Sequence, residues 1–487
     1  MKNQHPIKSR KLHSEQGSVL LVSLLVTAII GVTLASYLIL TQAQNRSVNR
    51  SQVWNSSIVL SEAGVEDALA LLNKYSGSFE QLTNWSASSS ISQDNWAAIG
   101  GNTYYVRRYL GDGYYDAYIT NSGSTPVIRS IGTVPWALVS VAPQAVFAAV
   151  GTPDYQGALG NASRKLSRAV GVNTRLDALF NVAMAAILQI DFNGQNVQTD
   201  SFDSADPNYS DNGLYPAGNP AKQKANGDVV TDYTIINALN VGNAKIKGQA
   251  KTGPNGSLYL GPNGSVGDKA WVESGTTGVQ PGHYADDMNV LFPDVVLPTT
   301  TWLPPQYQNV SVTYYGYVTN KAYKYAISQS GDYVIPGTSG SLFIFPGINV
   351  RLKITGTVSI TGVNDEIRVG GSGSDASVLK MYMDSGTFRL KGKGIVNPGG
   401  NAGNVYLFGT PNSTKIEYGG NGSFTGVVYA PQAAFDLGGG GNDVYDFVGA
   451  SVSKTVRMNG HYNFHYDENL RKNGMGRGYV PTSWKES

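Results

Sequence analysis

The sequence predicts an α+β protein that is mostly β, and three observations lead to this fold class. Residues 18–40 form an unbroken apolar run without charged residues. The following residues, to about position 75, continue with apolar side chains at helical spacing. The rest of the chain alternates short stretches of β-forming residues with turns rich in Gly, Asn, Asp and Ser. We therefore expect a long N-terminal hydrophobic helix, a small antiparallel β head and a large C-terminal parallel β-helix, or solenoid.

The composition limits the possible functions. The chain has 487 residues, a formal net charge of +2, 58 glycines and no cysteine. This length predicts about two or three structural units. Because no basic cluster lies outside the N-terminus, nucleic acid is not expected as a partner. The lack of Cys excludes disulfides and Cys-ligated zinc. Such a composition is typical of an exported β-rich protein.

The apolar run is long enough to cross a membrane. As a helix with a rise of ~1.5 Å per residue it would cover roughly 35 Å, and the hydrocarbon core of a bilayer measures ~30 Å. Four basic residues precede the run and two follow it: Lys2, Lys8, Arg10, Lys11, Arg46 and Arg50. This bias predicts a single-pass protein with a cytoplasmic N-terminus and the bulk of the chain outside.

Three interpretations of residues 18–40 are open: a removed secretion signal, an uncut anchor, or a pilin-type export signal that is cut at its polar end. The apolar part of a secretion signal has about 7 to 15 residues and precedes a small-residue cleavage site. Here the run is longer, and Thr41, Gln42 and Ala43 imitate such a site poorly. The first interpretation is therefore the least favoured.

The sequence after the run favours the third interpretation. Ile58, Val65, Leu69 and Leu72 fall on one face of a helix, and Gly77 follows as a stop signal. We therefore expect one helix of more than 50 residues in total, whose second half packs on a globular head.

This N-terminal segment resembles the type IV pilin superfamily and, within it, the PilX-type segment. The resemblance rests on a basic leader that ends in Gly17, the apolar stretch from Ser18, and "SEAGVEDAL" around Glu62 and Glu66. It implies cleavage by a prepilin peptidase between Gly17 and Ser18 and methylation of the new amino terminus. It also implies that the apolar half-helix leaves inner-membrane lipid to pack with other pilin or minor pilin subunits.

The fifth residue after the implied cleavage departs from the common pilin pattern. Most pilins carry Glu there, and its carboxylate can neutralise a neighbour's terminal amine in the low-dielectric filament core. This chain has Val22, which is similar to the PilX-type and K-type pseudopilin subset. A minor or tip subunit is therefore expected, with Val22, Leu25, Ile29 and Leu34 on the membrane and filament helix.

The expected organisation has four segments. They are a basic leader at 1–17, the transmembrane or pilin helix at 18–75, a small pilin-like β region at 76–180, and a β-solenoid domain at 181–480 with an insertion near 281–330. Alternating apolar and polar residues in the third segment predict antiparallel strands with one solvent-facing side. Three to five β-formers before each turn in the fourth segment suit β-helix rungs, and a two-sheet sandwich is the alternative.

The end of the chain carries a second resemblance. The stretches "FTGVVYAPQAAFDLGGGG" and "FVGASVSKTVRMNGHYNFHYDENL", within residues 424–470, resemble the C-terminal β-helical domain of uncharacterised bacterial PilX-like surface proteins. The resemblance implies an extracellular β-helical module without known chemistry.

Few residues suggest catalysis. Neither G-x-S-x-G nor a P-loop occurs. An enzyme on a β-helix would need a row of carboxylates along one face, for which the candidates are Asp365, Glu366, Asp384, Asp436, Asp443 and Asp446. Because Asp is common in turns for local reasons, we expect no enzyme, no catalytic residue and no cofactor.

No metal site is predicted either. His461 and His465 are four residues apart in a strand-like pattern, so their side chains would be roughly 13 Å apart on one face. We expect this segment to cap the solenoid. A second group offers oxygen ligands that Ca²⁺ accepts: Asp200, Asp203, Asp206 and Asp211. Its spacing does not match an EF-hand loop, and a solvated turn is the favoured interpretation.

The predicted function is that of a non-enzymatic pilin-like protein, a minor or tip subunit that serves filament assembly or adhesion at the cell surface. The expected partners are a prepilin peptidase, other pilin subunits, inner-membrane lipid and a glycan or another surface ligand. Two alternatives stay open. One is a membrane-anchored extracellular β-helix enzyme that acts on carbohydrate, and the other is an anchored surface scaffold whose leader is never cut.

Overall fold

The structure is a computed structural model of the chain. It describes residues 16–75, 77–78, 81–82, 91–121, 125–136, 164–193, 197–314, 317–420, 422–439, 444–459, 461–472 and 476–486. Two compact units are present. Unit 1 comprises Met1–Ser76, Asn84–Arg175 and Tyr479–Ser487, and unit 2 comprises Gly77–Thr83 and Leu176–Gly478. The chain is α+β and mostly β, as predicted.

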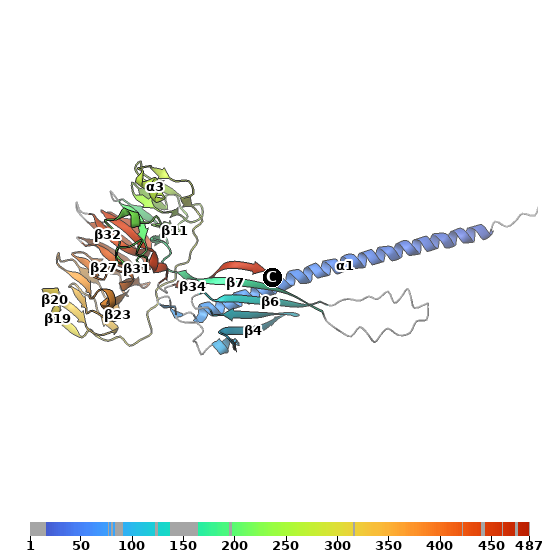
Figure 1. Ribbon diagram of the computed structural model, residues 1–487, viewed down its shortest axis with the longest axis horizontal. Coiled ribbons are helices and arrows are strands. Elements are labelled where there is room, and N and C mark those ends of the chain that lie inside the picture. Colours follow the sequence, from blue (N-terminus) through green and yellow to red (C-terminus); the bar gives the residue numbers. More distant parts are fainter. Residues whose placement is uncertain are drawn as a thin grey trace, which may run out of the picture. The chain divides into compact units, whose positions relative to one another are not determined.

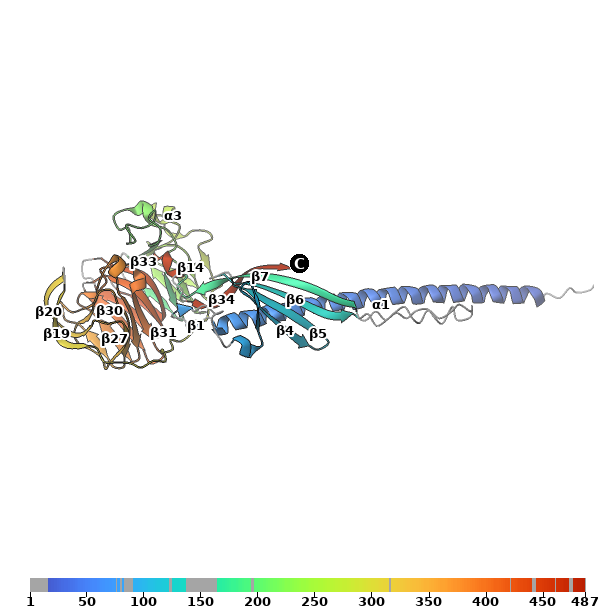
Figure 2. The ribbon, with the colours of Figure 1, turned by 60° about the horizontal axis from the view of Figure 1, so that its bottom comes forward.

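Unit 1 is built on one long helix. Helix α1 spans Gln16–Tyr75 and contains 60 residues, which confirms the predicted long N-terminal helix. Its second half lies along a six-stranded sheet of order β3-β4-β5-β6-β7-β34 (Figures 1 and 2). The strands are β3 Ala97–Gly100, β4 Thr103–Leu110, β5 Gly113–Thr120, β6 Val127–Trp136, β7 Arg164–Ala178 and β34 Gly476–Glu486. Pairing from β3 to β7 is antiparallel, as the alternating sequence predicts.

The predicted apolar face of α1 packs on this sheet. Val65 and Leu72 are buried, and Ile58 and Leu69 are partly buried against the same core. The helix can approach closely because Gly132 of β6 has no side chain: a Cβ there would lie 2.1 Å from the carbonyl oxygen of Ser57. This contact fixes the second half of α1 on the sheet.

Unit 2 consists mainly of short parallel strands arranged in long ladders. In the first ladder the spatial order is β21 Gly331–Ile335, β23 Asn349–Ile354, β26 Val378–Met383, β29 Val405–Gly409, β31 Phe424–Gly439, β32 Tyr445–Met458, β8 Met184–Ala186, β11 Val229–Thr231, β14 Ala250–Lys251 and β18 Tyr284–Ala285. Figure 2 shows the neighbouring strands β27, β30 and β31 side by side.

Two further ladders are parallel as well. The second contains β24 Val358–Ile360, β27 Thr387–Leu390, β30 Lys415–Gly420, β31, β32, β9 Ile190–Phe192, β12 Leu239–Gly242 and β15 Leu258–Leu260. The third contains β32, β33 Tyr462–Asp467, β10 Gln198–Phe202, β13 Lys245–Lys247, β16 Ser265–Gly267 and β17 Gly278–Val279.

The remaining strands of unit 2 form two small sheets. In a five-stranded sheet, β19 Tyr307–Tyr314 and β20 Tyr317–Ile327 form an antiparallel pair, and β20 is followed by parallel β22 Leu342–Ile344, β25 Glu366–Val369 and β28 Gly394–Val396. The strands β1 Gly77–Ser78 and β2 Gln81–Leu82 pair with each other.

The order along the ladders is not the order of the sequence. Strand β8, at the start of unit 2, pairs with β32 near its end, and β10 pairs with β33. The chain therefore enters the stack in its middle and builds one run to β18. It then passes to the opposite end of the stack and builds a second run, which returns to the strands where the first run began.

The connection between the two runs is an extended return segment, residues 286–306. Its contacts follow the first ladder in spatial order. The backbone N–H of Met288 donates to Thr252, that of Val290 to Asp232, and that of Leu303 to Asp332; Tyr429 and Gln432 donate to Pro293 and Asp294. This segment lies within the predicted insertion near 281–330, and it runs back along the ladder from β14 to β21.

Inward-facing side chains of successive strands stack on one another in unit 2. The rings of Phe424, Phe447 and Phe464 are stacked with centroid separations of 4.5 and 4.3 Å. All three side chains are buried. In β23, inward apolar residues alternate with more exposed ones, so that a run of six residues supplies three side chains to the core.

Candidate functional site

The first half of α1 is an exposed apolar surface. Val22, Leu25, Ile29 and Leu34 have relative exposures of 58%, 56%, 55% and 57%. No charged residue occurs between positions 18 and 40. Isolated exposed apolar side chains are normal in soluble proteins, but a continuous surface of this kind indicates contact with lipid or with another protein.

The polar side chains within this half bond to the helix itself. Hydroxyl groups donate to carbonyl oxygens one turn earlier: Ser23 to Leu20, Thr27 to Ser23, Thr33 to Ile29, Ser36 to Val32 and Thr41 to Tyr37, at 2.7–3.0 Å. A polar group in hydrocarbon must find its partner within the protein. These hydroxyl groups are satisfied without water. In the part of the chain that the structure describes, one helix is long and apolar enough to cross a membrane, and it is α1.

The second half of α1 explains the segment "SEAGVEDAL". Gly64 and Val65 face the sheet, where a Cβ on Gly64 would lie 2.8 Å from the ring of Tyr115. Glu62 and Glu66 are exposed. Polar contacts complete the attachment: Asp67 pairs with Arg108 at 2.7 Å and accepts a hydrogen bond from Tyr115. The sequence pattern thus separates a sheet-facing side from a solvent-facing side.

A buried hydroxyl group also joins the helix to two strands. The Oγ of Ser61 donates to the carbonyl oxygen of Arg168 at 2.7 Å and accepts from the backbone N–H of Gly132 at 2.8 Å. The two halves of α1 therefore differ in kind. Residues 57–72 are held by the sheet, whereas residues 19–40 present apolar side chains that the described strands of unit 1 do not cover.

The implied processing site lies at the start of this helix. Gly17 and Ser18 are in the first turn of α1. Leader residues 1–15 lie outside the described residues. Cleavage between Gly17 and Ser18 stays a prediction.

The carboxylates considered for an enzyme have separate partners. Asp365 accepts from Ser341, Asp384 from Thr410 and Asn412, Asp436 pairs with Lys415, and Asp446 contacts His465. Asp443 lies outside the described residues. These contacts distribute the carboxylates over different parts of the ladders, so the described ones do not form a shared carboxylate pair.

Glu366 is the most buried of these candidates. Burial alone would raise its pKa, but hydrogen bonds from Arg368 and Tyr323 hold the pKa below its ordinary value. The Asp384 carboxyl is in the same situation, since bonds from Asn412 and Thr410 outweigh burial and lower its pKa. A general acid for glycoside cleavage needs a raised pKa. Neither carboxyl has this property.

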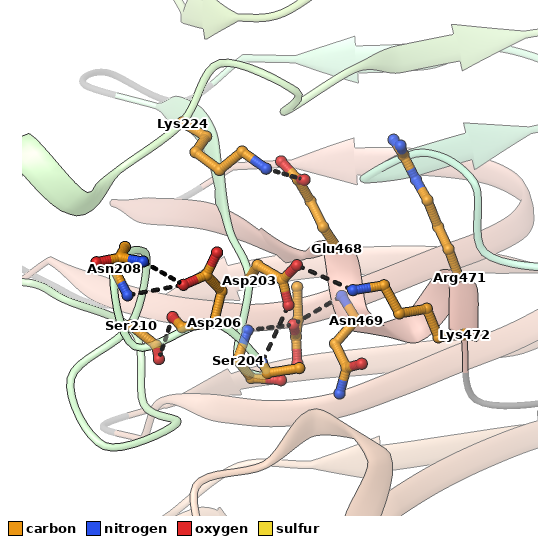
Figure 3. Close-up of polar contacts among 12 residues, drawn as sticks. Asp203, Ser204, Asp206, Asn208, Ser210, Lys224, Glu468, Asn469, Arg471 and Lys472 are labelled. Carbon is orange, nitrogen blue, oxygen red and sulfur yellow. Dashed lines mark hydrogen bonds and ion pairs between the residues drawn. The ribbon is translucent and has the colours of Figure 1, made fainter.

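The four aspartates considered for calcium are likewise dispersed. Asp203 pairs with Lys472 at 3.2 Å, Asp206 accepts from Asn208 at 2.9 Å, and Asp211 pairs with Lys222. Figure 3 shows Asp203 and Asp206 turned toward these different partners. Among the described residues, no group of three or more His, Cys, Asp or Glu side chains could hold a metal ion.

Asp200 instead takes part in a buried network around His465. The Nδ1 of His465 lies 2.6 Å from one oxygen of Asp200, and its Nε2 lies 3.2 Å from Asp446. Tyr215 donates to the other oxygen of Asp200, and its ring stacks on the imidazole at a centroid distance of 3.6 Å. Burial lowers the pKa of His465, but the two carboxylates outweigh it and raise the pKa to about 8.

A second network joins the same two chain segments. Glu468 of the 3₁₀ turn η6 Glu468–Lys472 contacts Lys224 (Figure 3). It also accepts hydrogen bonds from Ser201 at 2.8 Å and from Asn226 at 2.6 Å. Sequence analysis does not single out Lys224 or Glu468. They lie 244 positions apart, and only the pairing of β10 with β33 brings their neighbourhoods together. No local pattern could have indicated this contact.

The outward side of β10, β13 and β16 borders a polar pocket of about 550 Å³. The strand register places Gln198 beside Lys245 and Lys245 beside Ser265. Asn243 and Asn263, at turns, and the loop that follows helix α3 Lys269–Glu273 complete the lining. Sequence analysis does not identify this pocket.

Comparisons with known proteins find a matching family model and similar solved structures. Residues 345–473 match the family model "Domain of unknown function (DUF7305)", which covers less than half of the chain and extends from before β23 to η6. No curated protein matches the chain. A solved structure, the competence-associated pilin ComZ from Thermus thermophilus, is similar at 13% identity over 89% of this chain and 97% of that chain, with a TM-score of 0.20. A TM-score this low does not establish a shared fold.

Proposed function

We propose that the protein is a pilin-like surface subunit whose N-terminal helix anchors first in the inner membrane and then among other pilin subunits. One observation carries the proposal. A single helix has one half buried against its own sheet, while residues 19–40 keep their apolar side chains exposed. Desolvation of this half favours any surroundings that remove it from water, and both lipid and neighbouring apolar helices do so.

The subunit is proposed to be a minor or tip component. Val22 at the fifth position after Gly17 supports this role, because it lacks the carboxylate that would neutralise a neighbour's terminal amine. A subunit without this charge compensation is poorly suited to repeat along a filament. A subunit at the end of a filament packs its apolar helix against fewer neighbouring subunits than one in the middle.

Unit 2 is proposed to be a parallel β-helix displayed outside the cell. The three ladders of parallel strands and the inward stack of Phe424, Phe447 and Phe464 support this architecture. We propose that unit 2 serves display or adhesion rather than catalysis. The separate partners of the candidate carboxylates support this second point.

N-terminal processing provides the test. Mass spectrometry of the protein recovered from envelope fractions should give a chain that begins at methylated Ser18. Gly17→Ala should block the cleavage and leave the leader attached. Gly31→Ala is the matched control, since Gly31 lies in the same run with no atom within 4 Å of an added Cβ.

Two results would contradict the proposal. A wild-type chain that begins at Met1 would identify an uncleaved anchored scaffold. A chain that begins beyond Leu40 would identify a removed secretion signal, because the apolar half of α1 would then be absent from the mature protein.

A further inference from the structure

Several polar side chains that line the pocket beside β10, β13 and β16 lack partners among the residues that the structure describes. Within the described part of the chain, the side chains of Gln198, Lys245 and Asn263 have no hydrogen-bond or ion-pair partner. All three line the pocket. Their donors and acceptors are therefore open to a ligand.

Two polar side chains close to the pocket in sequence are satisfied internally. Lys247, two residues after Lys245, pairs with Glu273 at 3.0 Å. Asp268 accepts hydrogen bonds from the backbone N–H of Trp271 and from the side chain of Gln280, at 2.8 and 2.9 Å. Lys247 and Asp268 are therefore satisfied within the protein, whereas Gln198, Lys245 and Asn263 are open to a ligand.

The pocket has a firm wall. Ser265 Oγ donates to the carbonyl oxygen of Thr276 at 2.7 Å, which ties the loop after α3 to strand β16. Lys269 at the start of α3 contacts the carbonyl oxygens of Pro220 and Gln223 in the long connection that follows β10. The first contact holds the loop that lines one side of the pocket, and the second ties α3 to the connection after β10.

The lining chemistry selects the class of ligand. Amide and hydroxyl groups from Gln198, Asn263 and Thr277 can donate and accept hydrogen bonds, as a ligand rich in hydroxyl groups requires. Val272 is the apolar side chain among the described lining residues, and the others carry polar groups or are Gly. Among the described residues that line the pocket, Lys245 is the charged one and none is a carboxylate. The ligand should therefore carry a negative group as well as hydroxyl groups.

We infer that this pocket binds an oligosaccharide segment that contains a uronic acid or another carboxylate sugar. Lys245 pairs with the carboxylate, and the amide groups of Gln198 and Asn263 bind the sugar hydroxyl groups. The volume of about 550 Å³ is within the ~300–1,000 Å³ of small-ligand sites, so it accommodates a short segment of a chain. Neighbouring strands are ~4.8 Å apart, so polar side chains on successive strands form a regularly spaced row. An extended polymer can lie along this row and contact several of its side chains.

This proposal deepens the proposed display function, because it names the partner that unit 2 would contact. The binding itself is measured in solution and needs no filament. A failure to bind sugar and a failure of cleavage at Gly17 are therefore separate results.

Calorimetric titration of the full chain in detergent tests the proposal. The acidic probes are tetragalacturonate, a tetrameric glucuronate, a tetrameric mannuronate and a sialylated trisaccharide. Maltotetraose is the neutral probe, and sodium sulfate tests for charge alone. At least one acidic sugar should bind, and Lys245→Gln should weaken that binding about tenfold. Gln198→Ala should weaken it several-fold.

Lys391→Gln is the matched control and should leave binding unchanged, because Lys391 is an exposed lysine of unit 2 outside the pocket lining. Because Lys245 is exposed, its replacement should also leave the unfolding temperature unchanged. Three outcomes would overturn the proposal: no binding of any acidic sugar, equal binding of maltotetraose, or binding that Lys245→Gln and Lys391→Gln reduce equally. Binding of sulfate as strong as that of the sugar would also overturn the proposal, because the pocket would then bind any anion through its charge alone.

Discussion

His465 shows how a single residue connects distant parts of the sequence. It lies on β33 and contacts Asp200 on β10, 265 positions away. Asp446 and the ring of Tyr215 complete its surroundings. A buried imidazole that is stacked and bonded on both nitrogens stabilises one register of two strands, because a slip of the pairing would leave the carboxylate of Asp200 buried without its partner.

The stability of unit 2 should therefore depend on pH. The folded pKa of His465 is about 8, above the ordinary value of 6.5 for an exposed histidine. A group whose pKa is raised on folding stabilises the protein fully below its unfolded pKa, and this contribution disappears as the pH rises through the folded pKa. We expect a loss of at most ~2 kcal/mol in the free energy of unfolding between pH 6.5 and pH 8.

Urea unfolding, followed by intrinsic fluorescence at pH 6 and pH 8.5, measures this effect. His465→Gln should remove most of the difference between the two pH values. His461→Gln is the control and should preserve it. If His465→Gln retains the full difference, the imidazole is not the titrating group.

Gly132 provides a second prediction for a single residue. A Cβ at this position would lie 2.1 Å from the carbonyl oxygen of Ser57 and 2.6 Å from the backbone N of Ser61. Backbone atoms of a packed helix cannot move aside easily, so Gly132→Ala should destabilise unit 1 by about 1–3 kcal/mol. Gly31→Ala, with open space around its Cβ, should leave thermal unfolding unchanged or raise its midpoint slightly. Equal midpoints for the two variants would show that the helix does not pack here.

At the scale of elements, α1 is the part of the structure that the sequence predicts best. Its signals are local: an apolar run, helical spacing of Val65 and Leu72, and a Gly after its end. The antiparallel strands of unit 1 also follow from local alternation. Strand β34 is different, since its residues carry no sign that they return to the sheet that begins with β3, and sequence analysis does not predict it.

Charge in the first half of α1 should prevent membrane retention. Ile29 lies near the middle of the apolar run. A lysine at the centre of a membrane helix costs about 2.5–3.5 kcal/mol, so Ile29→Lys should shift the protein from the carbonate-resistant membrane fraction to the soluble or degraded fraction. Val48→Lys replaces another exposed apolar residue of α1 beyond the run and should leave the distribution unchanged. Equal distributions for both variants would exclude a membrane role for the run.

The parallel strands of unit 2 could be anticipated from the sequence, but their order could not. Short runs of β-forming residues between turns indicate strands, and β23 also shows the alternation of buried and more exposed positions. The pairing of β8 with β32 depends on two segments that are far apart in the sequence. Residue types that favour strands do not specify which strand is the neighbour. The His465 network and the polar pocket depend on that order, so they could not be found either.

At the scale of the whole molecule, the sequence of unit 2 lies between segments of unit 1. Its main part, Leu176–Gly478, follows Arg175, and the short segment Gly77–Thr83 also belongs to it. Both ends of the main part lead into strands in the middle of its ladders. The two runs are joined by covalent connection through residues 286–306 and also by strand pairing. The pairing should hold them together even when the connection is cut.

A protease site inserted at Val296 tests this expectation. Val296 is 72% exposed on the return segment, so the site should be accessible. After cleavage the two fragments should copurify in native buffer and separate only in denaturant, because β32 with β8 and β33 with β10 still join the runs. Fragments that separate without denaturant would show that the return segment, and not the ladder pairing, holds unit 2 together.

The entry and exit of the chain in the middle of the stack leave both outer ends of unit 2 remote in sequence from its attachment. New coils can be added after β18 or before β21, with a longer return segment, while β8, β10, β32 and β33 keep their neighbours. The length of unit 2 can thus change over evolution while the strands next to its chain ends keep their pairing.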